Sequence, residues 1–131
     1  MNLGRHWLAD YWGCRELTLT EWETAIGEAV AAAGLTLLRL QVHPFQPVGV
    51  TAAAILSESH LTVHTWPEED YVAVDLFTCG EAQRPQAALA TLERWLRPQH
   101  KVLTEVRRGQ APWRLPPATL ATETPAPCPK Q

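Results

Sequence analysis

The segment Ser57–Gly80, SESHLTVHTWPEEDYVAVDLFTCG, decides the fold that we expect for this chain. Its apolar and β-branched stretches Leu61–Thr65 and Tyr71–Phe77 predict two strands, and the acidic run Pro67–Asp70 between them predicts a turn. Because this connection is short, the two strands are expected to pair as an antiparallel hairpin.

Helical and extended patterns flank this hairpin on both sides. Apolar residues at helical spacing predict one helix from Thr18 or Thr20 to Ala33 and another over Gln83–Arg97. Gly34 is expected to end the first helix in a left-handed conformation, and Pro98 stops the second. Further strands are predicted over four ranges, namely Arg5–Gly13, Leu35–His43, Val48–Leu56 and Val102–Val106.

Together these elements predict an α+β fold, a two-layer sandwich in which two helices cover one face of an antiparallel sheet. The other face of that sheet also needs a cover. A second copy of the chain is the simplest candidate, so we expect a dimer with four layers in the order αββα.

Length and proline content predict how the chain is organised. Its 131 residues suit a single domain, which we expect over residues 1–110. Six of the eleven prolines lie between Pro112 and Pro129, so the Pro-rich segment 111–131 is expected to be disordered.

Charge, hydropathy and cysteine content exclude several classes of protein. A net charge of −3 without a basic run argues against nucleic acid as a partner. The longest apolar stretch, around Ala29–Leu38, is too short to span a membrane, and the N-terminus lacks a signal-peptide core. The three cysteines, an odd number, favour a reduced protein of the cytoplasm.

The hairpin carries an unusual cluster of polar side chains. His60, Thr62 and His64 alternate along the first strand and therefore share one face, and Cys79 follows the second strand. An antiparallel hairpin would return Cys79 to the neighbourhood of Ser59 and His60. Buried polar groups cost free energy unless they have partners, so the cluster requires an explanation.

Three explanations remain open at this point. The groups can be structural, with the serine capping a turn, a histidine bonded to a carbonyl and the cysteine acting as a small apolar residue. A metal site made of His60, His64 and Cys79 is disfavoured, because residues i and i+4 of a strand lie about 13 Å apart. The third explanation is covalent catalysis, with Ser59 or Cys79 as the nucleophile and His64 as the base.

A longer motif favours the third explanation. The run Glu58-Ser59-His60-x-x-x-His64-Thr65-Trp66-Pro67-Glu68, followed by Asp75-x-Phe77-Thr78-Cys79-Gly80, resembles the bacterial and archaeal S-adenosylmethionine decarboxylase family. The resemblance covers about residues 3–109. It extends to four shorter matches, Leu3–His6, Trp12–Cys14, His43-x-Phe45 and Gly49–Thr51.

The resemblance implies a proenzyme that cuts itself between Glu58 and Ser59 into a β chain, 1–58, and an α chain, 59–131. Ser59 Oγ would attack the Glu58 carbonyl to form an ester, and loss of the Ser59 α-proton would expel that ester and leave a pyruvoyl group. His64 matches the family residue that accepts the α-proton. Thr51 stands where the family has Ser or Thr assisting this step, and serine is the commoner choice.

The resemblance also implies the reaction and its binding site. The pyruvoyl group would form a Schiff base with S-adenosylmethionine and accept the electrons released by decarboxylation, so that neither a metal nor pyridoxal phosphate is needed. Cys79 matches the residue that reprotonates the product carbon. Phe45 matches an aromatic residue that stacks on adenine and Glu68 a carboxylate that holds the ribose hydroxyls, while Trp66 is a candidate second aromatic wall.

Alternatives remain open for several of these assignments. Phe45 can instead pack within its turn, and Trp66 can fill the core. The family resemblance implies dimers of αβ units whose product is the aminopropyl donor for spermidine synthesis. The same machinery can also serve ornithine or arginine decarboxylation in relatives that have changed substrate, and a non-catalytic homologue acting as a regulatory partner is a further alternative.

Overall fold

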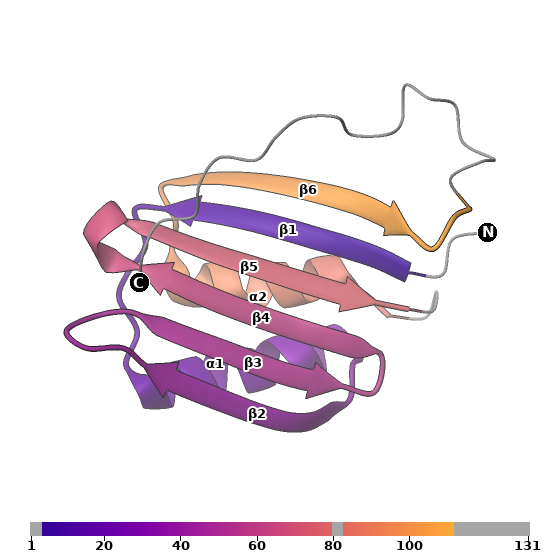
Figure 1. The fold of residues 1–131 in the computed structure, drawn as a ribbon, viewed down its shortest axis with the longest axis horizontal. Coiled ribbons are helices and arrows are strands. Elements are labelled where there is room, and N and C mark those ends of the chain that lie inside the picture. The colour runs from indigo at the N-terminus through magenta and orange to yellow at the C-terminus, as the bar shows by residue number, and fades with distance from the viewer. Residues whose placement is uncertain (1–3, 80–82, 112–131) are drawn as a thin grey trace.

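The hairpin expected in the centre of the chain lies in the middle of a six-stranded sheet (Figure 1). The structure is a computed structural model that describes residues 4–79 and 83–111. All neighbouring strands pair antiparallel. In their order across the sheet, the strands are β2 (Leu37–Pro44), β3 (Val50–Leu56), β4 (Ser59–Trp66), β5 (Tyr71–Thr78), β1 (Gly4–Trp12) and β6 (His100–Arg108).

Two helices, α1 (Leu19–Ala32) and α2 (Pro85–Leu96), lie against the same face of this sheet (Figure 1). Helix α1 begins with a capping box, in which Thr18 Oγ1 accepts from the Glu21 amide at 3.1 Å and Glu21 Oε1 accepts from the Thr18 amide at 3.0 Å. The chain leaves α1 through Gly34, whose φ of +72° is the left-handed conformation expected from the sequence.

The hydrophobic core fills the space between the helices and the sheet. Alternate strand residues are buried there, as the period of two in a strand requires. The largest side chains that are fully enclosed include Trp22, Ile26, Leu61, Leu76 and Leu92. This arrangement confirms the predicted α+β sandwich with two helices on one face of an antiparallel sheet.

Several element ends differ from those predicted from the sequence. Strand β4 begins at Ser59 instead of Leu61, because Ser59 pairs with Leu56 across the turn. Strand β6 covers His100–Arg108 instead of Val102–Val106, because it pairs with the whole length of β1. The acidic turn contains a short 3-10 helix, η1 (Pro67–Glu69).

The second face of the sheet, which we call the open face, carries no helix among residues 4–79 and 83–111 (Figure 1). The predicted Pro-rich segment lies, from residue 112 onward, outside the described residues. No helix in the described part of the chain is long and apolar enough to cross a membrane.

Candidate active site

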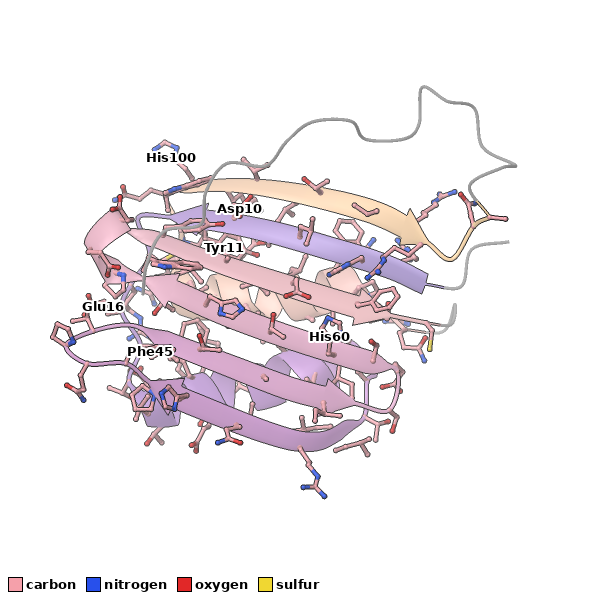
Figure 2. All side chains as sticks on the ribbon, viewed as in Figure 1. Asp10, Tyr11, Glu16, Phe45, His60 and His100 are labelled. Carbon is pink, nitrogen blue, oxygen red and sulfur yellow. The ribbon has the colours of Figure 1, made fainter. Side chains whose placement is uncertain are left out.

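The polar side chains of the hairpin project from the open face. His60, Thr62 and His64 alternate along β4 with Leu61, Val63 and Thr65, which are buried beneath the sheet. Figure 2 shows His60 and Phe45 toward opposite ends of this face. The prediction that His60, Thr62 and His64 share one face of the strand is therefore confirmed. The open face has two ends, and different side chains gather at each.

The first end surrounds the turn between β3 and β4, where Glu58 precedes Ser59. The loop that precedes β2 anchors this turn, because the Ser57 amide donates to the Thr36 carbonyl and Glu58 Oε1 accepts from the Thr36 amide, both at 3.0 Å. Ser59 has a φ of +149°, a conformation that costs a residue with a Cβ about 1–3 kcal/mol. Backbone strain is thus held at the residue that follows Glu58.

A chain of hydrogen bonds leads from Ser59 across three strands. Ser59 Oγ lies 3.1 Å from His60 Nδ1, and His60 Nε2 lies 2.9 Å from Asp75 Oδ1 on β5. His6 Nε2 on β1 reaches the same Asp75 oxygen at 3.0 Å, and the Thr62 hydroxyl donates to Asp75 Oδ2. Ser59, His60, Thr62, Asp75 and His6 form what we call the serine network.

Asp75 is the negative centre of the serine network. Burial raises the pKa of its carboxyl, but hydrogen bonds from Thr62, His6 and then His60 outweigh burial and leave the pKa below its ordinary value. Asp75 is therefore ionised at neutral pH and can only accept hydrogen bonds.

The serine network also brings possible metal ligands together. Ligand atoms of His6, His60 and Asp75 lie within 4.8 Å of one another. An ionised Asp75 can only accept, so the two Nε2 atoms, at 2.9 and 3.0 Å from its Oδ1, serve as donors, and this use leaves neither of them a lone pair for a metal. A hydrogen-bonded network accounts for the group without an ion.

The second end of the open face is aromatic. Trp66 stacks on Tyr71 with ring centroids 5.4 Å apart, Tyr71 stacks on Trp12 at 5.5 Å, and the His64 ring lies 6.0 Å from Trp66. His64 Nδ1 also lies 3.0 Å from the hydroxyl of Thr51, its partner across the β3–β4 ladder. Trp66 is buried by these contacts.

Phe45 and Glu68 lie beside this aromatic end. Phe45 follows β2 and is half-buried, and its amide donates to the Gly49 carbonyl at 2.8 Å. This loop requires glycine, because Gly49 has a φ of +106° and a Cβ there would come within 3.3 Å of the Thr65 carbonyl oxygen. Glu68 is exposed in η1, directly after Trp66 and Pro67.

The structure brings together only some of the residues that were singled out in the sequence. His60 pairs with Phe77, so Cys79 leaves β5 at the end of the sheet where β4 begins, as expected for a hairpin, and it is exposed. His64, by contrast, is five residues from Ser59 along β4, a separation of roughly 16 Å. Within one chain, therefore, His64 does not reach Ser59, and it does not share a metal site with His60 and Cys79.

Two members of the serine network, His6 and Asp75, received no role in the reasoning from sequence. Both lie within the motifs that resemble the decarboxylase family. The available signal was the alternation of β5, which places a charged residue, Asp75, on the same face as Phe77 in an otherwise apolar strand.

A cavity of about 220 Å³ lies beside the aromatic end, with Tyr71 in its lining, and none of its lining residues belongs to the serine network. It opens between the segment that follows β1 and the ends of β3 and β5, and Cys14, Trp22 and Asp70 are among the residues that line it. Burial, and next the charge of Asp70, raise the pKa of the Cys14 thiol to about 11. Cys14 is consequently a protonated thiol at neutral pH.

Comparison with known proteins places this geometry in a family. The family model described as S-adenosylmethionine decarboxylase matches residues 5–109. The S-adenosylmethionine decarboxylase proenzyme of Thermomicrobium roseum is 51% identical over 110 residues, which are 82% of this chain and 95% of the relative. The proenzyme of Methanococcus maripaludis is 41% identical over 111 residues, which are 82% of this chain and 91% of the relative.

A solved structure agrees with these sequence relatives. The crystal structure of the adenosylmethionine decarboxylase from Aquifex aeolicus superposes with a TM-score of 0.74 at 31% identity. The match covers 84% of this chain and 93% of the other. The chain thus belongs to the S-adenosylmethionine decarboxylase family, as its motifs indicated.

Proposed function

We propose that this chain is a proenzyme that cleaves itself between Glu58 and Ser59 and then decarboxylates S-adenosylmethionine by means of a pyruvoyl group made from Ser59. The observation that carries the proposal is the strained backbone of Ser59, with its φ of +149°, directly after Glu58 in a family whose relatives are named proenzymes. The product would be the aminopropyl donor for spermidine synthesis.

Self-cleavage follows from the groups around the turn. Ser59 Oγ would attack the Glu58 carbonyl carbon, the C–N bond would break, and an ester between Glu58 and the Ser59 side chain would replace the peptide bond. The strained Ser59 backbone raises the energy of the starting peptide and so favours this step. The two hydrogen bonds that join Ser57 and Glu58 to Thr36 would hold the attacked residue in place during the exchange.

The second step needs a base for the Ser59 α-proton, and we assign it to His64 with help from Thr51. Removal of this proton would expel the Glu58 carboxylate and leave dehydroalanine, which tautomerises and hydrolyses with release of ammonia. The Thr51 hydroxyl lies 3.0 Å from His64 Nδ1, a distance that supports their acting as a pair. The two chains produced would be β, residues 1–58, and α, residues 59–131.

The separation of roughly 16 Å between Ser59 and His64 on one strand supports a site shared by two copies. Two copies can face each other through their sheets, related by a two-fold axis that lies between the sheets and perpendicular to the strands. In this arrangement, the strands of the second copy run in the opposite direction to those of the first. The arrangement would set Ser59 of one copy opposite His64 of the other, because facing sheets pack only about 10 Å apart.

Exposed apolar side chains on the open face support the same dimer. Leu8, Ile55, Val102 and Val106 are each 39–51% exposed and lie on this face. Covering them with a second copy would remove apolar surface from water and give the four layers in the order αββα. We therefore propose a dimer of αβ units with two shared sites.

The pyruvoyl group would supply an electrophilic carbonyl that accepts the electron pair released when the substrate loses carbon dioxide. Its formation fits the position of Ser59, whose hydroxyl is held at the end of β4 with Cys79 leaving the same end of the sheet. Cys79 would deliver a proton from its Sγ to the carbon that has lost carbon dioxide. No residue role in this scheme requires a metal or pyridoxal phosphate.

Three residues at the aromatic end are assigned to substrate binding. We propose that Phe45 stacks on the adenine ring, that Glu68 accepts hydrogen bonds from the ribose hydroxyls, and that Trp66 forms a second wall. The stacking of Trp66 on Tyr71 fixes its orientation and supports its use as a rigid wall. These residues would reach the Ser59 of the second copy across the same interface as His64.

The organisation of the chain and its location complete the proposal. We assign the catalytic domain to residues 1–110 and treat 111–131 as a separate Pro-rich segment. A cytoplasmic location suits the enzyme, because a reducing compartment keeps the Cys79 thiol free for proton transfer.

Two measurements test the proposed function. Intact-mass analysis of the purified chain is expected to show two chains of roughly 6 and 8 kDa, and a protein that stays whole under reaction conditions would contradict it. Carbon dioxide release is then measured side by side with S-adenosylmethionine, ornithine and arginine. Release from ornithine or arginine alone would indicate a changed substrate, and cleavage without any release would favour a non-catalytic homologue.

A further inference from the structure

The serine network contains a base in contact with the hydroxyl that self-cleavage must activate. A serine hydroxyl is a weak nucleophile until a neighbouring group takes its proton. His60 Nδ1 lies 3.1 Å from Ser59 Oγ, whereas His64, the histidine assigned to the α-proton, lies roughly 16 Å away in the same chain. The nearest described imidazole to the attacking oxygen is therefore on the adjacent residue.

The direction of each hydrogen bond in the network follows from Asp75. An ionised carboxylate only accepts, so the Nε2 atoms of His60 and His6, at 2.9 and 3.0 Å from Asp75 Oδ1, must both carry protons. In the neutral form of the ring, a proton on Nε2 places the lone pair of His60 on Nδ1, where it can accept a hydrogen bond from Ser59 Oγ–H.

The same assignment satisfies the outer members of the network. His6 protonated on Nε2 has its lone pair on Nδ1, which lies 3.3 Å from Arg108 Nη1, a donor. The Thr62 hydroxyl occupies the other oxygen of Asp75. Every group thus has a partner of the correct polarity, and the arrangement holds His60 in the single tautomer that can act as a base toward Ser59.

We propose that His60 is a catalytic residue of self-cleavage, in which its Nδ1 takes the proton of Ser59 Oγ as that oxygen attacks the Glu58 carbonyl. The Oγ–C bond forms, the Glu58 C–N bond breaks, and the same proton passes to the departing Ser59 nitrogen. Asp75 acts as a positioning residue that fixes the His60 tautomer and balances the imidazolium charge. The proposal rests on the proposed cleavage between Glu58 and Ser59.

This assignment divides the two proton transfers between two histidines. His60 would act on the hydroxyl proton before the ester exists, and His64 on the α-proton after the ester has formed. The two roles predict different products when one histidine is removed. A chain without His64 should stop at the ester, while a chain without His60 should stop at the intact peptide.

The experiment compares His60→Gln, Asp75→Asn and His64→Ala with the wild-type chain and with a control, His100→Gln, which changes an exposed histidine on β6. Each purified full-length chain is incubated with and without hydroxylamine, which cleaves esters but leaves peptide bonds intact. Intact-mass analysis follows cleavage with time. Circular dichroism and thermal unfolding establish that each variant is folded.

We expect His60→Gln to slow cleavage by at least about 100-fold and to remain whole in hydroxylamine, because no ester forms. Asp75→Asn should behave in the same way to a lesser degree, since the amide can donate to His60 Nε2 and move the ring proton to Nδ1. His64→Ala should remain whole until hydroxylamine divides it, and His100→Gln should cleave like the wild type.

The outcomes separate this proposal from the function on which it rests. A wild-type chain that never divides would overturn the proposed cleavage and the role of His60 with it. If the wild type divides while His60→Gln keeps its rate, or accumulates a hydroxylamine-sensitive ester, the role of His60 is wrong and the cleavage stands. Asp75→Asn need not fold for this decision, because His60→Gln alone decides it.

Discussion

The two ends of the open face differ in chemistry although the same strand, β4, connects them. At the Ser59 end, a strained serine is hydrogen-bonded to an imidazole that a carboxylate holds. At the other end, the rings of His64, Trp66 and Tyr71 lie against one another. Under the proposed function, the first end moves protons and the second offers a rigid aromatic surface.

The difference shows why one chain is an incomplete enzyme under the proposed function. Ser59 begins β4, whereas the residues proposed to bind the substrate lie around the opposite end of that strand. If two open faces pair with their strands in opposite directions, the Ser59 end of each copy lies against the aromatic end of the other. The dimer would then contain two such sites.

The largest effect is expected from Ser59→Ala, which removes the attacking hydroxyl at the strained end. The chain should stay whole indefinitely and have no decarboxylase activity, because neither the ester nor the pyruvoyl group can form. Ser57→Ala is the matched control, since this exposed residue of the same turn anchors the chain through its backbone amide. Intact-mass analysis measures both, and division of the Ser59→Ala chain would disprove cleavage by this residue.

The pairing of the two ends is tested by mixing two inactive variants. Ser59→Ala and His64→Ala should each remain uncleaved when expressed alone. In co-expressed, separately tagged mixed dimers, the His64→Ala chain should divide, because its own Ser59 meets the intact His64 of the other copy. The Ser59→Ala chain should stay whole. Purified mixed dimers in which both chains remain intact would argue against a shared site.

How much of this could be predicted from the sequence depends on the range of the interactions involved. The hairpin and helices were predictable, because alternation along β4 and β5 and helical spacing in α1 are local patterns. The start of β4 at Ser59 was missed, because it depends on pairing with Leu56 across the turn. The residues at which a strand begins and ends depend on the strands that pair with it, and local amino-acid composition does not show where that pairing stops.

The serine network could not be assembled from the sequence alone. It joins His6 to Asp75 and His60 through the register of β1, β5 and β4, in which His6 lies opposite Phe77 and Phe77 opposite His60. A shift of one residue in either pairing would send these side chains to the other face. The separation of His64 from Ser59 was implicit in their spacing, but its meaning depends on how two copies pair.

A large but partial effect is expected from Cys79→Ala at the Ser59 end. The chain should still divide, because the thiol takes no part in the acyl shift, yet turnover should fall by about 100-fold or more. Cys14→Ala is the matched control, since burial and then the charge of Asp70 raise the pKa of that thiol to about 11, and it lines the cavity beside the aromatic end and not the serine network. Carbon dioxide release from S-adenosylmethionine measures both, and full activity of Cys79→Ala would exclude it as the proton donor.

A smaller effect is expected at the aromatic end from Phe45→Leu. Loss of ring stacking on adenine should raise KM for S-adenosylmethionine by about twofold to tenfold, with self-cleavage unaffected. Val48→Ala changes an exposed residue of the same loop and should leave KM unchanged. Steady-state carbon dioxide release at varied substrate concentration gives both values. An unchanged KM would remove Phe45 from the binding site.

The smallest effect concerns stability and belongs to the serine network. Because the folded-state pKa of Asp75 lies below its ordinary value, its contribution to folding is complete above the unfolded pKa of about 3.9 and is lost as pH falls through the folded value. In a Ser59→Ala background, which keeps every chain whole, Tm should therefore fall more steeply below about pH 5 with Asp75 than with Asp75→Asn. Parallel slopes would mean that the carboxylate at this end gains nothing from its partners, and the contrast between the two ends would then rest on the aromatic stacking alone.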